Sequence, residues 1–194
     1  MKIAILGWGS LISEPRGLPI DGKWQQEGPA IWIEFSRISQ CGARAGCLTL
    51  VIDERSDEEV RTLYAVSPRT DLTQAIADLQ EREGTSPEDI GFCEGASSRF
   101  APNALLRHPN SCERIRAWAL EKGFDAVVWT ALGRRFKDVL GIPFTPAAAL
   151  NYVNGLPAPT KEMALAYIHA APEQTMTPFR RLLLDQPGSA DGED

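Results

Sequence analysis

The sequence predicts an α+β fold from three observations. Segments with strand character cluster in the first third of the chain, segments with helical character dominate the last third, and the two do not alternate regularly. The 194 residues, 43% of them hydrophobic, suffice for one domain with a substantial core. We therefore expect a single domain over 1–185. The polar, acidic stretch over 186–194 contains proline and glycine and predicts a disordered tail.

Five segments have the sequence patterns of β-strands. The short apolar run at 2–6 predicts a buried first strand. Apolar and polar residues alternate over 30–39 and 47–53, and the glycines between these segments predict an antiparallel hairpin. Residues 59–66 predict a further strand. The nearly continuous apolar run over 124–132 predicts a strand buried on both faces.

The first helix is expected over 70–83, where apolar residues recur at helical spacing. Thr70 or Asp71 can cap its start, and Gly84 can end it. Ser111 is the candidate cap of a second helix that runs to Lys122. The remaining segments are expected to be helical over 145–155, 160–171 and 177–184. Residues 13–30 are expected to be irregular, with room for one short element near Trp24, and 91–108 are expected to form a loop.

Charge and composition exclude several classes of partner. The formal charge of −6 argues against a general affinity for nucleic acid, which needs clustered excess lysine and arginine. No apolar run is long enough to span a membrane, and the N-terminus lacks the layout of a signal peptide, so we expect a cytoplasmic protein. The four cysteines form no Cys-x-x-Cys pair and are expected to be reduced thiols. With only two histidines, we expect no metal site and no cofactor.

The first strand leads directly into Gly7-Trp8-Gly9-Ser10-Leu11, a pattern that resembles a nucleotide-binding loop. The dinucleotide fingerprint, however, needs glycine or alanine where Ile12 stands and a long helix where Pro15 intervenes. A phosphate-binding P-loop needs a Gly-Lys-Ser/Thr triplet, which is absent from the sequence. Two interpretations stay open. Gly7, Gly9 and Ser10 form a cradle of backbone amides for a carboxylate, with Trp8 as a pocket wall, or the glycines relieve crowding and Trp8 belongs to the core.

Glu83 stands directly before Gly84, at the expected end of the 70–83 helix. A carboxylate in the last helical turn faces the negative end of the helix dipole, which makes it a candidate general base. The alternative is a solvated surface glutamate, which is the better interpretation for its neighbour Glu81.

Taken together, these two motifs resemble the gamma-glutamylcyclotransferase-like superfamily. Its members carry a Tyr-Gly-Ser-Leu or Tyr-Gly-Ser-Asn loop after the first strand and a catalytic glutamate in a Glu-Gly pair after a helix. The matching residues here are Trp8-Gly9-Ser10-Leu11 and Glu83-Gly84, within roughly residues 1–85. Trp8 departs from the family tyrosine. The resemblance implies a small mixed β-barrel flanked by helices, with the C-terminal helices as an extension.

The resemblance also implies a reaction. Gly7 to Leu11 would hold a small γ-glutamyl substrate, and Glu83 would act as general acid and base while the substrate cyclises to 5-oxoproline and releases an amine or amino acid. The main alternative is a non-catalytic protein of the same fold that binds a carboxylated metabolite. A third possibility is a hydrolase in which Glu83 activates water.

Further candidate residues are weaker. Three arginines could bind a substrate carboxylate, namely Arg37, Arg44 and Arg99, and Thr130 could line the pocket, whereas Trp129 is expected in the core. The sequence does not predict an oligomeric state.

Overall fold

The computed structural model of this chain describes residues 1–186. Its strands are β1 (Ile3–Gly7), β2 (Asp21–Gln25), β3 (Ala30–Ile31), β4 (Ile33–Ile38), β5 (Leu48–Ile52), β6 (Val60–Arg61), β7 (Leu63–Val66), β8 (Ile90–Glu94) and β9 (Ala126–Thr130). Its helices are α1 (Ser10–Ser13), α2 (Leu72–Glu83), the 3₁₀ turn η1 (Pro87–Asp89), α3 (Pro102–Arg107), α4 (Pro109–Lys122), α5 (Phe136–Leu140), α6 (Pro146–Asn154), α7 (Ala158–His169) and α8 (Pro178–Leu184). The α+β prediction is confirmed.

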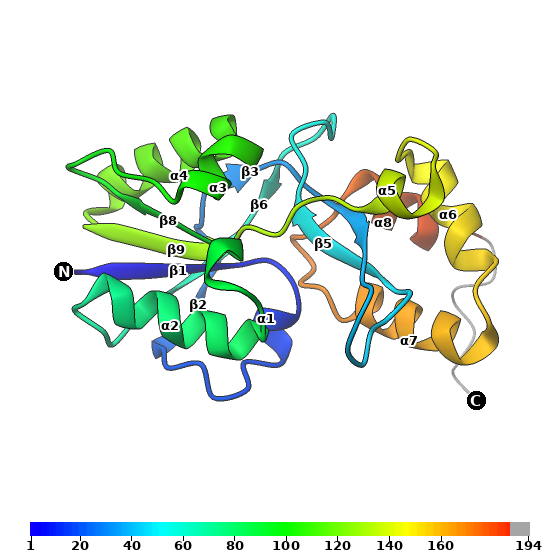
Figure 1. Ribbon diagram of the computed structural model, residues 1–194, viewed down its shortest axis with the longest axis horizontal. Helices are drawn as coiled ribbons and strands as arrows, with labels where there is room; N and C mark the ends of the chain where they lie inside the picture. Colours follow the sequence, from blue (N-terminus) through cyan, green and yellow to red (C-terminus); the bar gives the residue numbers. More distant parts are fainter. Residues whose placement is uncertain (187–194) are drawn as a thin grey trace.

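The largest sheet has the strand order β2-β7-β1-β9-β8 (Figure 1). Its central strands β1 and β9 run parallel, and its other neighbours are antiparallel. Two further antiparallel ribbons, β3–β6 and β4–β5, stand beside it. Because the two parallel strands point the same way, the loop after β1 and the segment after β9 leave the sheet at the same edge.

The central strands are buried on both faces, as the apolar run at 124–132 predicts. Along β1, Ile3 and Ile5 pack with α2, whereas Ala4 and Leu6 belong to the cluster that contains the inner face of α4. The same alternation in β9 places Val128 with α2 and Val127 with α4. Side chains alternate across a strand, so two opposite helical layers cover one strand pair.

Helix α2 begins and ends where the sequence predicts. The Asp71 carboxylate accepts a hydrogen bond from the Gln74 amide at 3.0 Å, which caps the first turn. Gly84 has φ 60°, a left-handed conformation that favours glycine, and its amide donates to the carbonyls of Gln80 and Glu81. The helix therefore ends on Glu83, next to the loop after β1.

The predicted 30–39 and 59–66 strands are each divided in two. Trp32 separates β3 from β4, and Thr62 separates β6 from β7. The Pro29 carbonyl accepts from both the Thr62 hydroxyl at 2.9 Å and the Thr62 amide at 3.1 Å. Each divided strand bends, so β3–β6 connects the β4–β5 hairpin to the large sheet.

The C-terminal helices pack against the β4–β5 hairpin (Figure 1). Phe35 on β4 contacts Phe179 of α8 and Tyr167 of α7 through edge-to-face rings, with centroids 5.6 and 6.1 Å apart. The buried Glu34 carboxylate accepts a hydrogen bond from the Phe179 amide at 3.1 Å, at the start of α8. The three helices predicted after residue 145 are confirmed, and α5 is an addition.

Two local predictions are wrong. Residues 91–108, expected as a loop, contain most of β8 and all of α3, because Phe92 and Cys93 pair with β9, and Cys93 is buried and Phe92 partly buried despite the surrounding glycines and serines. Ser111 does not cap α4, which begins at Pro109 with His108 in the cap position.

Two expectations are not tested by these residues. The hydrogen-bonded ladders over residues 1–186 leave β2 and β8 as sheet edges, so the family's closed barrel is not confirmed. The predicted tail lies, from residue 187 onward, outside the described residues. Over the described part of the chain, none of the helices has the length and apolarity that crossing a membrane requires.

Gly91 on β8 tests the packing of the large sheet. A Cβ added there would lie 2.3 Å from Cε2 of the buried Trp129 ring, which the core prevents from moving. We expect Gly91→Ala to lower the free energy of unfolding by about 3 kcal/mol, measured by urea denaturation. Gly155→Ala is the matched control, because an added Cβ would lie 3.4 Å from the Asn151 carbonyl and the Gly155 backbone is right-handed helical, so no loss is expected. Equal effects of the two changes would contradict this packing.

Candidate functional site

A cavity of ≈ 320 Å³ lies between the loop after β1, the end of α2 and the β4–β5 hairpin. We call it the site cavity. Every residue that the sequence proposes for the site lines it, namely Gly7, Trp8, Gly9, Ser10, Leu11 and Glu83. The structure therefore brings the loop and the glutamate together, although more than seventy positions separate them in the sequence.

The loop after β1 turns into the single-turn helix α1, with Gly9 in the cap position. The Ile12 amide donates to the Gly9 carbonyl at 2.9 Å, whereas the amides of Ser10 and Leu11 precede any possible partner within the helix. A side chain on Gly7 would meet the Trp24 ring at 2.9 Å, and one on Gly9 would lie 3.3 Å from the Tyr167 hydroxyl. Both glycines thus allow close approach, and the Ser10 and Leu11 amides are the ones available for a cradle.

Trp8 belongs mainly to the core. Its side chain is part of the large apolar cluster, only 6% of the residue is exposed, and its carbonyl accepts a hydrogen bond from the buried Thr175 hydroxyl at 3.1 Å. Trp8 also lines the site cavity, so the structure agrees with both interpretations that the sequence leaves open; its core contacts follow because the alternation along β1 continues into Trp8 and turns it toward the side of Leu6.

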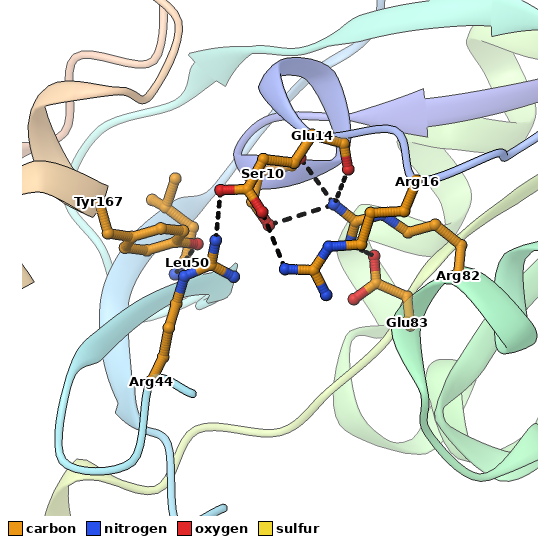
Figure 2. A network of polar contacts seen from close by, with 8 residues as sticks. All are labelled: Ser10, Glu14, Arg16, Arg44, Leu50, Arg82, Glu83 and Tyr167. Atoms are coloured by element: carbon orange, nitrogen blue, oxygen red, sulfur yellow. Dashed lines mark hydrogen bonds and ion pairs between the residues drawn. The ribbon is translucent and has the colours of Figure 1, made fainter. Parts of the chain in front are cut away.

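Arg82 connects the end of α2 to the loop. Its side chain is 4% exposed, and one guanidinium nitrogen donates to the carbonyls of Ser10 at 2.6 Å and Glu14 at 2.7 Å (Figure 2). The other terminal nitrogen donates to Oε1 of Glu83 at 2.7 Å. Both terminal nitrogens of this buried cation are paired, whereas its Nε has no partner among the described residues, so this one side chain fixes both the loop and the carboxylate.

Glu83 lies at the cavity with 16% of its side chain exposed. Figure 2 shows its carboxylate beside the guanidinium of Arg82, with Ser10 between it and Tyr167. Arg82 holds Oε1, whereas no hydrogen bond from a described residue is recorded for Oε2. The carboxylate is therefore neither a fully solvated surface group nor a fully paired one.

Tyr167, on α7, is a cavity residue that sequence reasoning missed. Its hydroxyl accepts a hydrogen bond from the Leu50 amide at 3.4 Å, and burial raises the pKa of this phenol. The guanidinium of Arg44 lies 4.8 Å from the ring centroid and also pairs with Glu14 at 2.7 Å (Figure 2). No local pattern distinguishes Tyr167 from any other residue of an amphipathic helix, so only the tertiary structure could identify it.

Arginine side chains dominate the charge of the cavity wall. Arg37 and Arg44 line the cavity as the sequence proposes, together with Arg16 and Arg82, whereas Glu83 is the single acidic group there. Arg37 donates to the Gly133 carbonyl at 2.6 Å but forms no ion pair within residues 1–186, and burial lowers the pKa of its guanidinium. The cavity is thus suited to an anionic ligand.

The remaining residues named from the sequence lie in three different places. Arg99 lies elsewhere and forms an ion pair with Glu94 at 2.7 Å. Thr130 lines the cavity, and Trp129 is fully buried in the core, as expected. Within residues 1–186, no group of three or more histidine, cysteine, aspartate or glutamate side chains is arranged to hold a metal ion.

Comparison with known proteins adds no relative. No protein-family model, no curated protein and no solved structure matches the chain significantly. Its function must therefore be inferred from the cavity itself. One carboxylate, one phenol, unpaired amides and a guanidinium can bind an anionic group and transfer a proton within the bound molecule.

Arg82 provides a direct test of how the site is held. We expect Arg82→Gln to lower the free energy of unfolding by about 3 kcal/mol, because it leaves two carbonyls and a carboxylate without their cation. Arg16→Gln is the control, since Arg16 is exposed and pairs only with Glu14, and it should cost less than about 1 kcal/mol. Urea denaturation followed by tryptophan fluorescence measures both, and similar losses would show that Arg82 is not the fixed point of the site.

Proposed function

We propose that this protein is a gamma-glutamylcyclotransferase-like enzyme that converts a small γ-glutamyl compound to 5-oxoproline and an amine or amino acid. The observation that carries the proposal is the shared cavity of Glu83 and the Gly9–Leu11 backbone, with Arg37 on its wall. One carboxylate and a preorganised loop suffice for this reaction, because nucleophile and electrophile belong to the same molecule.

In the proposed mechanism, the amides of Ser10 and Leu11 and the guanidinium of Arg37 bind the α-carboxylate of the γ-glutamyl group. Glu83 accepts a proton from the α-ammonium through Oε2, the oxygen that Arg82 leaves free. The neutral amine attacks the γ-carbonyl carbon, and a carbon–nitrogen bond closes the five-membered ring. The bond to the departing nitrogen then breaks as Glu83 returns the proton to that nitrogen, and the ring nitrogen gives up its second proton, which the released amine takes up as it becomes an ammonium.

Tyr167 is the candidate for stabilising the oxyanion that forms on the γ-carbonyl. Its hydroxyl accepts from the Leu50 amide, so its own proton is free to be donated, and a side chain on Gly9 would lie 3.3 Å from it. In the family, a tyrosine stands where Trp8 stands here. We propose that Tyr167 supplies a phenol to this cavity from a different element.

The proposal extends to fold and location. The bends at Trp32 and Thr62 connect the β4–β5 hairpin, β3–β6 and the large sheet into one curled path, which supports a barrel of the family type. The cysteines are free thiols, of which three are buried, and this agrees with the reducing cytoplasm as the site of the reaction.

Replacing the proposed base is the central test. We expect Glu83→Gln to lower kcat for 5-oxoproline release by about 10³-fold, because the amide cannot accept the proton. The assay uses a panel of γ-glutamyl dipeptides and γ-glutamyl amines, with thermal unfolding to confirm that the variant folds. Glu81→Gln is the matched control, an exposed carboxylate on the same helix that should leave kcat unchanged.

The products distinguish the alternatives. Release of free glutamate by a Glu83-dependent reaction would indicate hydrolysis by activated water instead of cyclisation. Tight binding of a γ-glutamyl compound without turnover would indicate a non-catalytic binding protein. Turnover that survives Glu83→Gln would remove Glu83 from its proposed role.

Arg37 tests the binding part of the mechanism. We expect Arg37→Gln to raise KM by about 10-fold with a smaller change in kcat, because a charged hydrogen bond to the substrate carboxylate is lost in ground state and transition state alike. Arg99→Gln, which removes an exposed arginine outside the cavity, should change neither constant. A fall in kcat alone for Arg37→Gln would contradict a role in which Arg37 binds the ground state and the transition state equally well.

A further inference from the structure

A second and larger cavity, of ≈ 670 Å³, lies on the other side of β4. We call it the second cavity. Glu34 and Ser36 of β4 line it, whereas Arg37 lines the site cavity, and the two cavities have no lining residue in common. Its other walls come from the loop after β5, the α3–α4 junction, and the chain from Gly133 through α5 to the start of α6. Its volume is within the range of small-molecule sites, roughly 300–1,000 Å³.

Two residues that line the second cavity each carry a buried polar atom with no hydrogen-bond partner among the described residues. These atoms are Oγ of Ser36, a residue that is 0% exposed, and Nε2 of His108, a residue that is 3% exposed. An unsatisfied buried polar group costs about 1–3 kcal/mol and is rare in native proteins. The other buried polar groups of this wall are satisfied, because Glu34 accepts from the Phe179 amide and Asp53 pairs with Arg134. Ser36 and His108 are thus the groups left for a ligand.

His108 offers a polar ring nitrogen. Burial lowers the pKa of its imidazole to about 4, so the ring is neutral at pH 7. A neutral imidazole has one donor nitrogen and one acceptor nitrogen, so Nε2 donates or accepts according to the tautomer. The Ser36 hydroxyl can also donate or accept, so a ligand hydroxyl can satisfy either group.

The charges around the second cavity favour an anion. Three cations of the wall form no ion pair within residues 1–186, namely Lys137, Arg55 and Arg135. Two acids of the wall, Asp57 and Asp138, form no ion pair there either. The remaining arginines of the wall, Arg107 and Arg134, are paired with Asp89 and Asp53. The Glu34 carboxylate accepts hydrogen bonds from the Phe35 and Phe179 amides, so it is not among the groups free to meet a ligand. Cations therefore exceed acids among the groups free to meet a ligand.

We propose that the second cavity binds a small organic anion that carries hydroxyl groups, such as a phosphorylated sugar or polyol. One ligand hydroxyl bonds with Nε2 of His108 and another bonds with Oγ of Ser36, while the anionic group lies toward Lys137, Arg55 and Arg135. An apolar wall comes from Phe136 and Phe144, whose ring centroids lie 5.2 Å apart in an edge-to-face contact. This site is distinct from the site cavity and does not depend on the function proposed for it.

Isothermal titration calorimetry of the full chain tests the proposal. The probes are glycerol 3-phosphate, ribose 5-phosphate and glucose 6-phosphate, with ribose and inorganic phosphate as partial probes. We expect at least one of the three phosphorylated probes to bind with a Kd below about 1 mM, and ribose and phosphate each to bind about 10-fold more weakly, because each partial probe lacks one half of the recognised chemistry.

Variants locate the binding. Ser36→Ala and Lys137→Gln should each raise the Kd of the probe that binds by about fivefold. Ser36→Ala removes a hydroxyl that has no partner, so its melting temperature without probe should stay the same or rise, which separates lost binding from lost folding. Lys23→Gln, an exposed lysine on β2, and Glu83→Gln, in the site cavity, are controls that should leave the affinity unchanged.

Three results would overturn the proposal. The first is the absence of binding by all three phosphorylated probes up to about 10 mM. The second is equal affinity for inorganic phosphate, which would reduce the second cavity to an ion site. The third is binding that Ser36→Ala and Lys137→Gln leave intact, which would place the ligand elsewhere.

Discussion

The buried guanidinium of Arg82 is the interaction on which the candidate site depends. It joins the last turn of α2 to the carbonyls of the loop after β1 and to the carboxylate of Glu83. A cation removed from water must find acceptors in the protein, and here two carbonyls and one carboxylate supply them, so its position is strongly determined. The loop and the glutamate are held in one geometry because they satisfy the same charge. Without this cation, two elements far apart in the sequence would share a cavity without a fixed relation.

The parallel pairing of β1 and β9 has a second consequence for the architecture. Both strands end at the same edge of the sheet, so the Gly7–Leu11 loop and the chain after Thr130 leave it side by side. Thr130 and Leu132 line the site cavity, and the chain from Gly133 onward lines the second cavity. Ligand sites at the carboxyl ends of parallel strands are common in mixed sheets. Here one short segment and the strand β4 separate two cavities that are both rich in arginine. The site cavity adds the carboxylate of Glu83, and the second cavity adds the buried, unpaired polar groups of Ser36 and His108.

Much of the fold was predictable because the decisive signals are local. The Asp71 cap, the Gly84 termination and the two-sided burial of 124–132 follow from neighbouring residues. Strand β8 was not predictable, since glycines and serines around it indicate a loop and only its pairing with β9 makes it a strand. The interruptions at Trp32 and Thr62 were not predictable either, because they arise where β3 continues into β4 and β6 into β7, each pairing with a different partner strand. Local strand propensity does not predict a strand that is formed because pairing with a distant segment satisfies its backbone hydrogen bonds.

For the site, the sequence by itself determined which residues stand at the two motifs: a glycine-flanked turn after a buried strand and a glutamate at a helix end. It also determined that Arg37 and Arg44 are available nearby in the chain. Only the tertiary structure decided that Trp8 turns into the core, that Tyr167 reaches the cavity from α7, and that Arg82 binds loop and carboxylate together. The physical reason is that a motif encodes the backbone within a few residues, whereas the partners of a buried charge or ring are set by the packing of elements distant in the sequence.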